Sequence, residues 1–404
     1  MSIKDLKYII YIPSFYGTIF FNLFYFFYLL DIIKFDDGCF SAHIIFGLSS
    51  FLFIFNTIIF LKYYKIVIET KYGFSSDLVP DKNIRFIKII MFLFYGIGFL
   101  GNFLYLLGAA DFFGGFLNFF LVLFSDNSSE IRANGDAYSD SIGFQLSYFS
   151  WIASAVTLSL IITRKISKKY YILFVFNILI NLLFIDRTRP IWILITCLLT
   201  ILPFIHFKLT NRKILKYFIT FSVAIMFIFS LLAIVSNKQT DKSNFKSWDL
   251  PPEIIGILNY GVSPYAYFNY IIIHEDIEEI TLDRTIYPLK KVTSKLGLTN
   301  NPSSLINEFY YVPTPTNVGT FLEPFYRDGG YFFVFLGILL HTFVFNIIGL
   351  YLLKSRNFFG IYAYANICFV DLFSFFTPKI NNFPIWLFIV IGIIAIYLNK
   401  VKYK

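Results

Sequence analysis

Residues 316–345 read TNVGTFLEPFYRDGGYFFVFLGILLHTFVF, and the two halves of this stretch differ sharply in character. The first half contains two acids, an arginine and two adjacent glycines: Glu323, Asp328, Arg327, Gly329 and Gly330. The second half is almost entirely apolar, which predicts a helix that crosses a membrane. Ionisable groups at membrane depth usually mark a functional site. The stretch therefore predicts a membrane helix with a charged, functional rim at its first end.

The composition of the whole chain agrees with a membrane environment. Of the 404 residues, 57% are hydrophobic, 22% are aromatic and only 15% are charged, which excludes a soluble domain of this size. The sequence predicts an all-α polytopic integral membrane protein, with a retained first helix that is too long for a signal peptide. The ten predicted spans cover residues 8–31, 39–61, 87–109, 143–163, 170–185, 190–207, 216–235, 330–353, 358–376 and 383–399. The apolar segment 111–124 is too short to span, and we expect it to lie at the interface or to re-enter.

Charge orients this topology. With both termini in the cytoplasm, the inner segments hold 21 of the 34 lysines and arginines and only four acids, whereas the outer segments are acidic. This distribution follows the positive-inside rule. The net charge of +9 therefore indicates topology and anionic lipid headgroups, and it excludes nucleic acid as the expected partner.

The predicted spans divide the chain into three parts. Residues 1–235 contain spans one to seven, residues 236–329 form a large extracytoplasmic loop, and residues 330–404 contain spans eight to ten. A loop of this length is usually functional. Apolar residues at helical spacing after Pro251-Pro252, and the amphipathic segment 289–298, predict a small helical cap on the outer membrane face.

No cofactor or metal is expected. Cys39, Cys197 and Cys368 are far apart in the sequence, and the chain has no nucleotide-binding or metalloprotease motif. For the histidines in or near spans (His43, His206, His341), hydrogen bonding between helices is the expected role.

Two arginine-bearing span ends face the large outer loop. Asp186, Arg187 and Arg189 lie at the tip of a predicted hairpin, and Arg327 precedes the eighth span. Snorkelling arginines that anchor helix ends are the alternative for the hairpin. Arginines normally anchor on the cytoplasmic side, however, and the guanidinium group suits bidentate binding of phosphate. These arginines therefore predict a phosphate-binding rim.

The same residues carry a resemblance to a known family. Asn317-Val318-Gly319-Thr320, Pro324-Phe325-Tyr326 and Asp328-Gly329-Gly330, followed by a long apolar helix, resemble the Wzy-type polymerases of O-antigen and other oligosaccharide repeat units. The chain departs from their pattern by having Gly329 where an aromatic residue is common. Upstream, Arg187-Thr188 resembles the family's arginine-threonine step into a span, with Arg189 as the alternative. The segment 257–272, which contains Tyr260, is similar to a tyrosine-containing part of the family's outer loop.

The resemblance implies a GT-C-like membrane glycosyltransferase in the bacterial cytoplasmic (inner) membrane, working on its outer face. Its implied partners are undecaprenyl-diphosphate-linked oligosaccharides as donor and acceptor, membrane lipids and a polysaccharide chain-length regulator. The expected diphosphate-binding residues are Arg187, Arg189, Arg284 and Arg327. The candidate catalytic bases are Glu323, Asp328, Glu275 and His274. Positioning roles are expected for Asn317, Thr320, Tyr326, Gly329, Gly330 and Tyr260. No metal is expected to take part, because arginines supply the positive charge.

Three other functions fit parts of the sequence. An O-antigen ligase-like enzyme would share the architecture and transfer the glycan to a different acceptor. A flippase or other transporter of lipid-linked oligosaccharides would show repeated halves and charged residues within spans, whereas here only Asp371 lies deep in a span and no internal repeat is visible. A polyprenyl-phosphate-sugar glycosyltransferase would use paired acids in the first outer loop, for which Asp36-Asp37 are the candidates.

Overall fold

A computed structural model describes residues 3–31, 38–72, 84–123, 125, 142–183, 188–206, 252–277, 279–305, 307–312 and 315–401. Five of the helices in these ranges are long and apolar enough to cross a membrane, and two shorter helices are also strongly apolar. The chain is therefore a helical, multi-pass membrane protein. The seventh predicted span, 216–235, and the acids Asp36-Asp37 lie outside the described residues, and the total of ten crossings stays a prediction.

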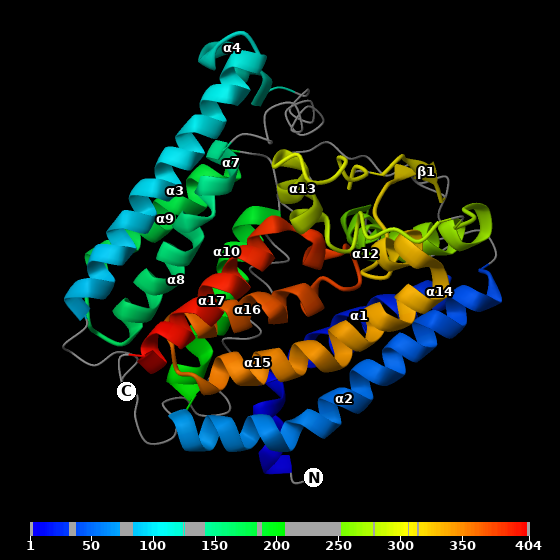
Figure 1. The fold of residues 1–404 in the computed structure, drawn as a ribbon, viewed down its shortest axis with the longest axis horizontal. Coiled ribbons are helices and arrows are strands. Elements are labelled where there is room, and N and C mark those ends of the chain that lie inside the picture. The colour runs from blue at the N-terminus through cyan, green and yellow to red at the C-terminus, as the bar shows by residue number, and fades with distance from the viewer. Residues whose placement is uncertain are drawn as a thin grey trace. The chain divides into compact units, whose positions relative to one another are not determined.

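Apart from the span at 216–235, all the predicted spans contain helices (Figure 1). The elements are η1 (Ile3–Tyr11), α1 (Pro13–Leu29), α2 (Phe40–Tyr72), α3 (Ile84–Phe112), α4 (Phe116–Leu123), α7 (Ile142–Ser147), α8 (Phe149–Ile162), η3 (Lys168–Tyr170), α9 (Tyr171–Leu182), α10 (Thr188–Ile205), α12 (Pro252–His274), α13 (Tyr287–Lys295), β1 (Tyr310–Tyr311), β2 (Pro315–Thr316), α14 (Glu323–Leu339), the π-helical turn η6 (Leu340–Val344), α15 (Phe345–Lys354), α16 (Phe358–Leu372), η7 (Lys379–Asn381) and α17 (Phe383–Val401). Within the described ranges, the antiparallel pair β1–β2 is the only sheet.

The chain forms two compact units, of which the first contains Met1–Glu69 and Gln239–Lys404. Helix α16 is the centre of this unit, because every side chain from Gly360 to Asp371 is buried. It packs against α1, α15 and α17. A central helix of this kind has no lipid-facing side, so its polar residues must find partners on neighbouring helices.

Polar side chains connect the helices of the first unit. Asn346 of α15 bonds to Ser14 of α1 through both its amide oxygen and its amide nitrogen, at 3.1 and 2.9 Å. The Ser14 hydroxyl also lies 2.8 Å from Thr57 Oγ1 of α2. Three helices far apart in the sequence are thus joined by one buried hydrogen-bonded chain.

Helix α12 coincides with the first helix predicted for the outer loop, but it is packed more deeply than a surface cap. It lies along α1, where the Tyr265 hydroxyl donates a 2.7 Å hydrogen bond to the carbonyl oxygen of Phe21. Tyr265, Tyr267 and Phe268 are fully buried. These three aromatic residues of α12 therefore contribute to the core of the unit.

The second unit contains Thr70–Lys238, and within it α3 packs closely against α7 and α8. Small residues permit this approach: a Cβ atom added to Gly98 would lie only 2.3 Å from the backbone nitrogen of Ser150. Helix interfaces in membranes favour small residues for this reason. In contrast, a Cβ atom added to Gly96, on the same helix, would meet nothing within 4 Å.

This contrast gives a matched test of the packing. Gly98→Ala is expected to lower the free energy of unfolding by about 1–3 kcal/mol, because the backbone of α8 must move away. Gly96→Ala is expected to leave it unchanged or raise it by up to ~1 kcal/mol, through helix propensity alone. Thermal unfolding in detergent compares the two variants. Equal unfolding temperatures would show that α3 and α8 do not pack as described.

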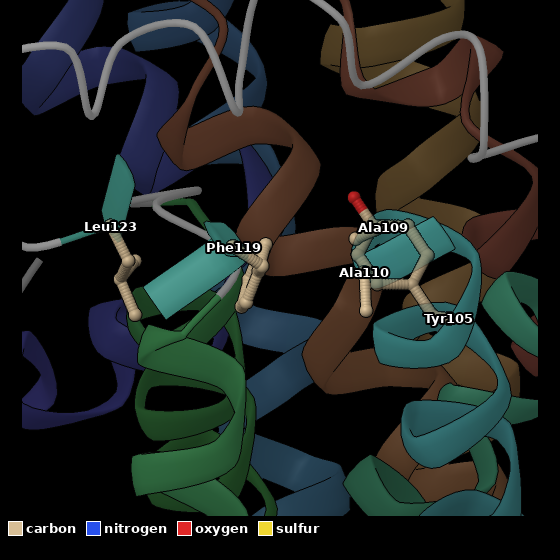
Figure 2. Packing of buried hydrophobic residues seen from close by; sticks show 5 residues of the cluster. All are labelled: Tyr105, Ala109, Ala110, Phe119 and Leu123. Carbon is tan, nitrogen blue, oxygen red and sulfur yellow. The ribbon is translucent and has the colours of Figure 1, made fainter. Parts of the chain in front are cut away.

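The predicted non-spanning segment 111–124 folds back on the end of α3. Gly114 and Gly115 form the turn with φ angles of +77° and +123°, which favour glycine. Figure 2 shows the small core that results, with Phe119 and Leu123 from α4 beside α3 residues. The α3 members are Tyr105, Ala109 and Ala110. A short apolar helix is thereby stabilised by its neighbour and needs no crossing of its own.

Candidate functional site

The glycine pair interrupts α14 at the point where the sequence changes character. Gly329 and Gly330 have non-helical backbone angles, and Gly330 (φ +63°, ψ −150°) is in a region that only glycine adopts readily. The helical turn Glu323–Asp328 is therefore set off from the long apolar run that follows. This break agrees with the predicted start of the eighth span at residue 330.

Four charged side chains of the first unit meet beside this turn. Glu323 and Arg327 pair along the helix with 3.3 Å between Oε1 and Nε, as their spacing of four residues predicts. Arg284 Nη1 lies 3.1 Å from the same Glu323 oxygen, and Arg327 also pairs with Glu275. We call these four residues, Arg284, Arg327, Glu275 and Glu323, the arginine–carboxylate cluster. Asn307 lies among them.

Asn307 connects the two arginines of the cluster. Its Oδ1 accepts hydrogen bonds from Arg284 Nη1 at 2.5 Å and from Arg327 Nη1 at 2.8 Å. Its backbone and amide group also exchange hydrogen bonds with Asn317, at 3.1 and 3.3 Å. Asn317, a predicted positioning residue, contacts the cluster through Asn307, and its positioning role stays a prediction. Asn307 itself was missed, because a lone asparagine in a polar loop carries no sequence signal.

Asp328 anchors the loop that carries Arg284. Its carboxylate accepts hydrogen bonds from the Thr281 hydroxyl at 2.9 Å and from the backbone nitrogens of Arg284 and Thr285 at 3.1 and 2.6 Å. Its backbone oxygen accepts a further bond from the Thr281 nitrogen at 2.7 Å. With both oxygens occupied by the loop, Asp328 suits a positioning role better than that of a base.

Glu323 is the most enclosed acid of the cluster. Its side chain is 4% exposed, compared with 26% for Glu275. A Cβ atom at Gly319 would lie 2.5 Å from Glu323 Cβ, so the glycine lets the preceding chain approach the carboxylate. Two arginines balance two glutamates, and the cluster is formally neutral before any ligand binds. A buried charge is tolerated only when it is paired in this way.

Tyrosines extend the cluster along α12. The Tyr267 hydroxyl accepts from Arg327 Nη2 at 3.4 Å and donates to the carbonyl oxygen of Glu308 at 3.4 Å. Burial, opposed by the charge of Arg327, raises the pKa of the Tyr267 phenol, which therefore stays neutral. Beyond it, a small recess is lined by Ala266, Asn269, Tyr270, Ile273, His274 and Val312. His274, a candidate base, is exposed there and lies against the Tyr270 ring at 4.2 Å.

The hairpin arginines belong to the second unit. Arg187 lies outside the described residues. Arg189, at the start of α10, is buried among aromatic rings, with its guanidinium carbon 4.1 Å from the centroid of Phe144. Tyr105 and Tyr148 complete this cage at 5.5 and 5.8 Å, and Arg189 Nη1 is 3.5 Å from Ser147 Oγ. This environment holds Arg189 by cation–π contacts.

The remaining positioning candidates also belong to the first unit. The Thr320 carbonyl oxygen accepts a hydrogen bond from the Glu323 backbone nitrogen at 3.2 Å, and Tyr326 is buried with its ring nearly perpendicular to that of Phe268. Tyr260 stacks on Phe376 at 4.3 Å. Among the described residues, no group of three or more His, Cys, Asp or Glu side chains is arranged to hold a metal ion, and independence from metals stays a prediction.

Comparisons with known proteins add no relative to this picture. No family model, no curated protein and no solved structure matches the chain.

Proposed function

We propose that the protein is a membrane glycosyltransferase that joins undecaprenyl-diphosphate-linked repeat units into an O-antigen or capsular-type polysaccharide on the outer face of the cytoplasmic membrane. The observation that carries the proposal is the arginine–carboxylate cluster, set directly before a long apolar helix. Its residues Glu323 and Arg327 lie in the stretch that resembles the Wzy-type polymerases. A lipid-linked substrate requires a polar site next to a membrane-spanning helix, because its lipid carrier stays in the bilayer.

The reaction assigns a task to each kind of side chain. The acceptor sugar hydroxyl attacks the anomeric carbon of the donor, its proton passes to Glu323, and the bond between that carbon and the diphosphate oxygen breaks. A positioned base of this kind typically contributes ~10²–10⁴-fold in rate. Negative charge develops on the departing diphosphate, and the planar guanidinium groups of Arg284 and Arg327 suit its oxygens.

The neutral cluster must open to receive the diphosphate. Glu275 is the partner that we expect to leave Arg327, because its side chain is 26% exposed and follows the last residue of α12. Glu323, at 4% exposure and held by two arginines, is expected to stay. Exchange of Glu275 for a phosphate oxygen would keep Arg327 paired throughout binding, so no uncompensated charge is left buried.

Deletion of the gene, followed by electrophoresis of the surface polysaccharide, tests this function against its alternatives. If the protein is a polymerase, the deletion strain should carry surface glycan that consists of a single repeat unit on each anchor. Complete absence of glycan on the acceptor, with polymer still made on the lipid carrier, would indicate a ligase. Retention of repeat units on the cytoplasmic side would indicate a flippase. An unchanged ladder of polymer lengths would contradict all three.

The proposed site also requires that the large loop lies outside. We expect reporter fusions at Lys71 and Asn300 to report opposite sides of the membrane, with Lys71 in the cytoplasm. The reason is the distribution of 21 basic residues on the inner segments against 13 on the outer segments. Alkaline phosphatase and green fluorescent protein fusions measure the two positions independently. The same location for both fusions would contradict the topology.

A further inference from the structure

A second ionisable pair lies inside the first unit, away from the arginine–carboxylate cluster. His341 and Asp371 are both completely buried, and His341 Nδ1 lies 2.8 Å from Asp371 Oδ1. His341 belongs to the π-helical turn η6, and Asp371 lies near the end of α16. The predicted role of His341 in hydrogen bonding between helices is confirmed by this contact. The burial and contacts of the pair indicate an additional role.

Burying an ionisable pair between apolar helices has an unfavourable desolvation free energy. Among the described residues, the second polar atoms, His341 Nε2 and Asp371 Oδ2, have no hydrogen-bond partner. Replacing a buried ionisable pair by apolar residues often leaves stability unchanged or increases it. The π-helical turn that presents His341 is also a distortion that occurs frequently at functional sites. Stability of the fold alone therefore does not explain the pair.

Direct contacts lead from the pair to the segment that carries Glu323. The His341 ring lies 4.4 Å from the ring of Phe321 and 6.4 Å from that of Phe325, measured between centroids. On the other side, the Ser374 nitrogen donates to the Asp371 carbonyl oxygen at 3.2 Å, and the Ser374 carbonyl oxygen accepts from the Phe321 nitrogen at 2.9 Å. Phe321, two residues before Glu323, therefore contacts the His341 side chain directly and is connected to the end of α16 at Asp371 through the backbone of Ser374.

We propose that His341 and Asp371 form a clamp between η6 and α16 that fixes the segment 320–325 and thereby positions the Glu323 carboxylate against Arg284 and Arg327. The clamp itself follows from contacts within the unit. Only its consequence for catalysis rests on the proposed function. Both members are positioning residues, because neither touches the cluster.

Two variants separate a clamp from a contribution to stability. The double variant His341→Phe/Asp371→Leu removes the hydrogen bond without leaving an unpaired charge, so its unfolding temperature in detergent is expected to equal or exceed that of the wild type. Asp371→Asn keeps an acceptor for the Nδ1–H of a neutral histidine and is the conservative control. Hydrogen–deuterium exchange of a peptide that covers residues 318–326 measures the clamp without any substrate.

The clamp predicts that exchange of this peptide, which contains the Phe321 amide, becomes about 10-fold faster or more in the double variant and stays close to the wild-type rate in Asp371→Asn, as expected when one strong hydrogen bond is lost or kept. Native exchange in the double variant, or equally fast exchange in both variants, would overturn the clamp. In a polymerisation assay, kcat of the double variant should fall by about 10- to 100-fold with an unchanged KM for the donor, because small displacements of a catalytic group are costly. Unchanged kcat with fast exchange would overturn the link to Glu323.

A wild-type protein that makes no polymer would instead refute the proposed function, and the exchange result would still decide the clamp.

Discussion

Glu323→Gln is expected to abolish polymer formation while leaving the protein folded, inserted and able to bind its lipid-linked donor. Glutamine keeps the shape of the side chain and accepts a hydrogen bond from Arg284, but it cannot take a proton from the acceptor hydroxyl. Loss of a general base typically costs ~10²–10⁴ in rate. Polymer length on a gel, together with binding of labelled donor to the purified variant, measures the two properties separately.

Glu275→Gln is the matched control, because Glu275 pairs with the same arginine as Glu323. It is expected to retain polymer formation and to bind the donor at least as tightly as the wild type, since Arg327 no longer has to release a carboxylate. Normal polymer from Glu323→Gln would reject Glu323 as the base and pass the role to Asp328, Glu275 or His274. Loss of polymer in both variants would show that the charge balance of the cluster matters more than a base.

Arg327→Lys should cost about 10²–10³-fold in rate, the loss expected when a donor to a developing anion is removed. Arg327 donates hydrogen bonds to Asn307 through Nη1 and to Glu275 through Nη2, and its Nε lies at ion-pair distance, 3.3 Å, from Glu323 Oε1. A lysine ammonium is a single point charge and cannot replace this fork. Arg284→Lys is expected to behave similarly. Arg85→Lys, at an exposed position in the first turn of α3, is the control and should leave the rate unchanged.

The same measurement of polymer formation tests the hairpin arginines, Arg187 and Arg189. Arg187 was predicted to grip the diphosphate together with Arg327, with Arg189 as the alternative. Because Arg189 is enclosed by aromatic rings, we expect Arg189→Lys to affect the stability of its unit, through lost cation–π contacts, as well as activity. Normal polymer from Arg187→Lys, Arg189→Lys and Arg327→Lys combined in one protein would eliminate the diphosphate-binding role of these arginines.

Local features of the site could be predicted from the sequence. The change from charged to apolar residues at position 330 coincides with the backbone break at Gly329 and Gly330, where the positive φ of Gly330 favours glycine. The spacing of Glu323 and Arg327 predicts their contact, since both lie on one helical turn. Signals of this kind depend only on neighbouring residues in the chain.

Contacts between distant segments could not be predicted in the same way. Asp328 binds the backbone of residues more than forty positions earlier, and Asn307 joins two arginines from different segments. The amphipathic pattern of residues 289–298 predicts a short helix in the loop that brings them together, but it does not indicate which distant residues the loop contacts. The cage around Arg189 is also built from other helices, through Tyr105, Phe144 and Tyr148. Composition reveals the aromatic residues but not their partner.

The most direct test of the central claim is a polymerisation assay with the purified protein in liposomes that contain undecaprenyl-diphosphate-linked repeat units. The proposed function predicts a ladder of lipid-linked products that is undiminished by chelator, is lost in Glu323→Gln and persists in Glu275→Gln. Wild-type protein that leaves every repeat unit at its original length, or that extends them only when magnesium is added, would contradict the account.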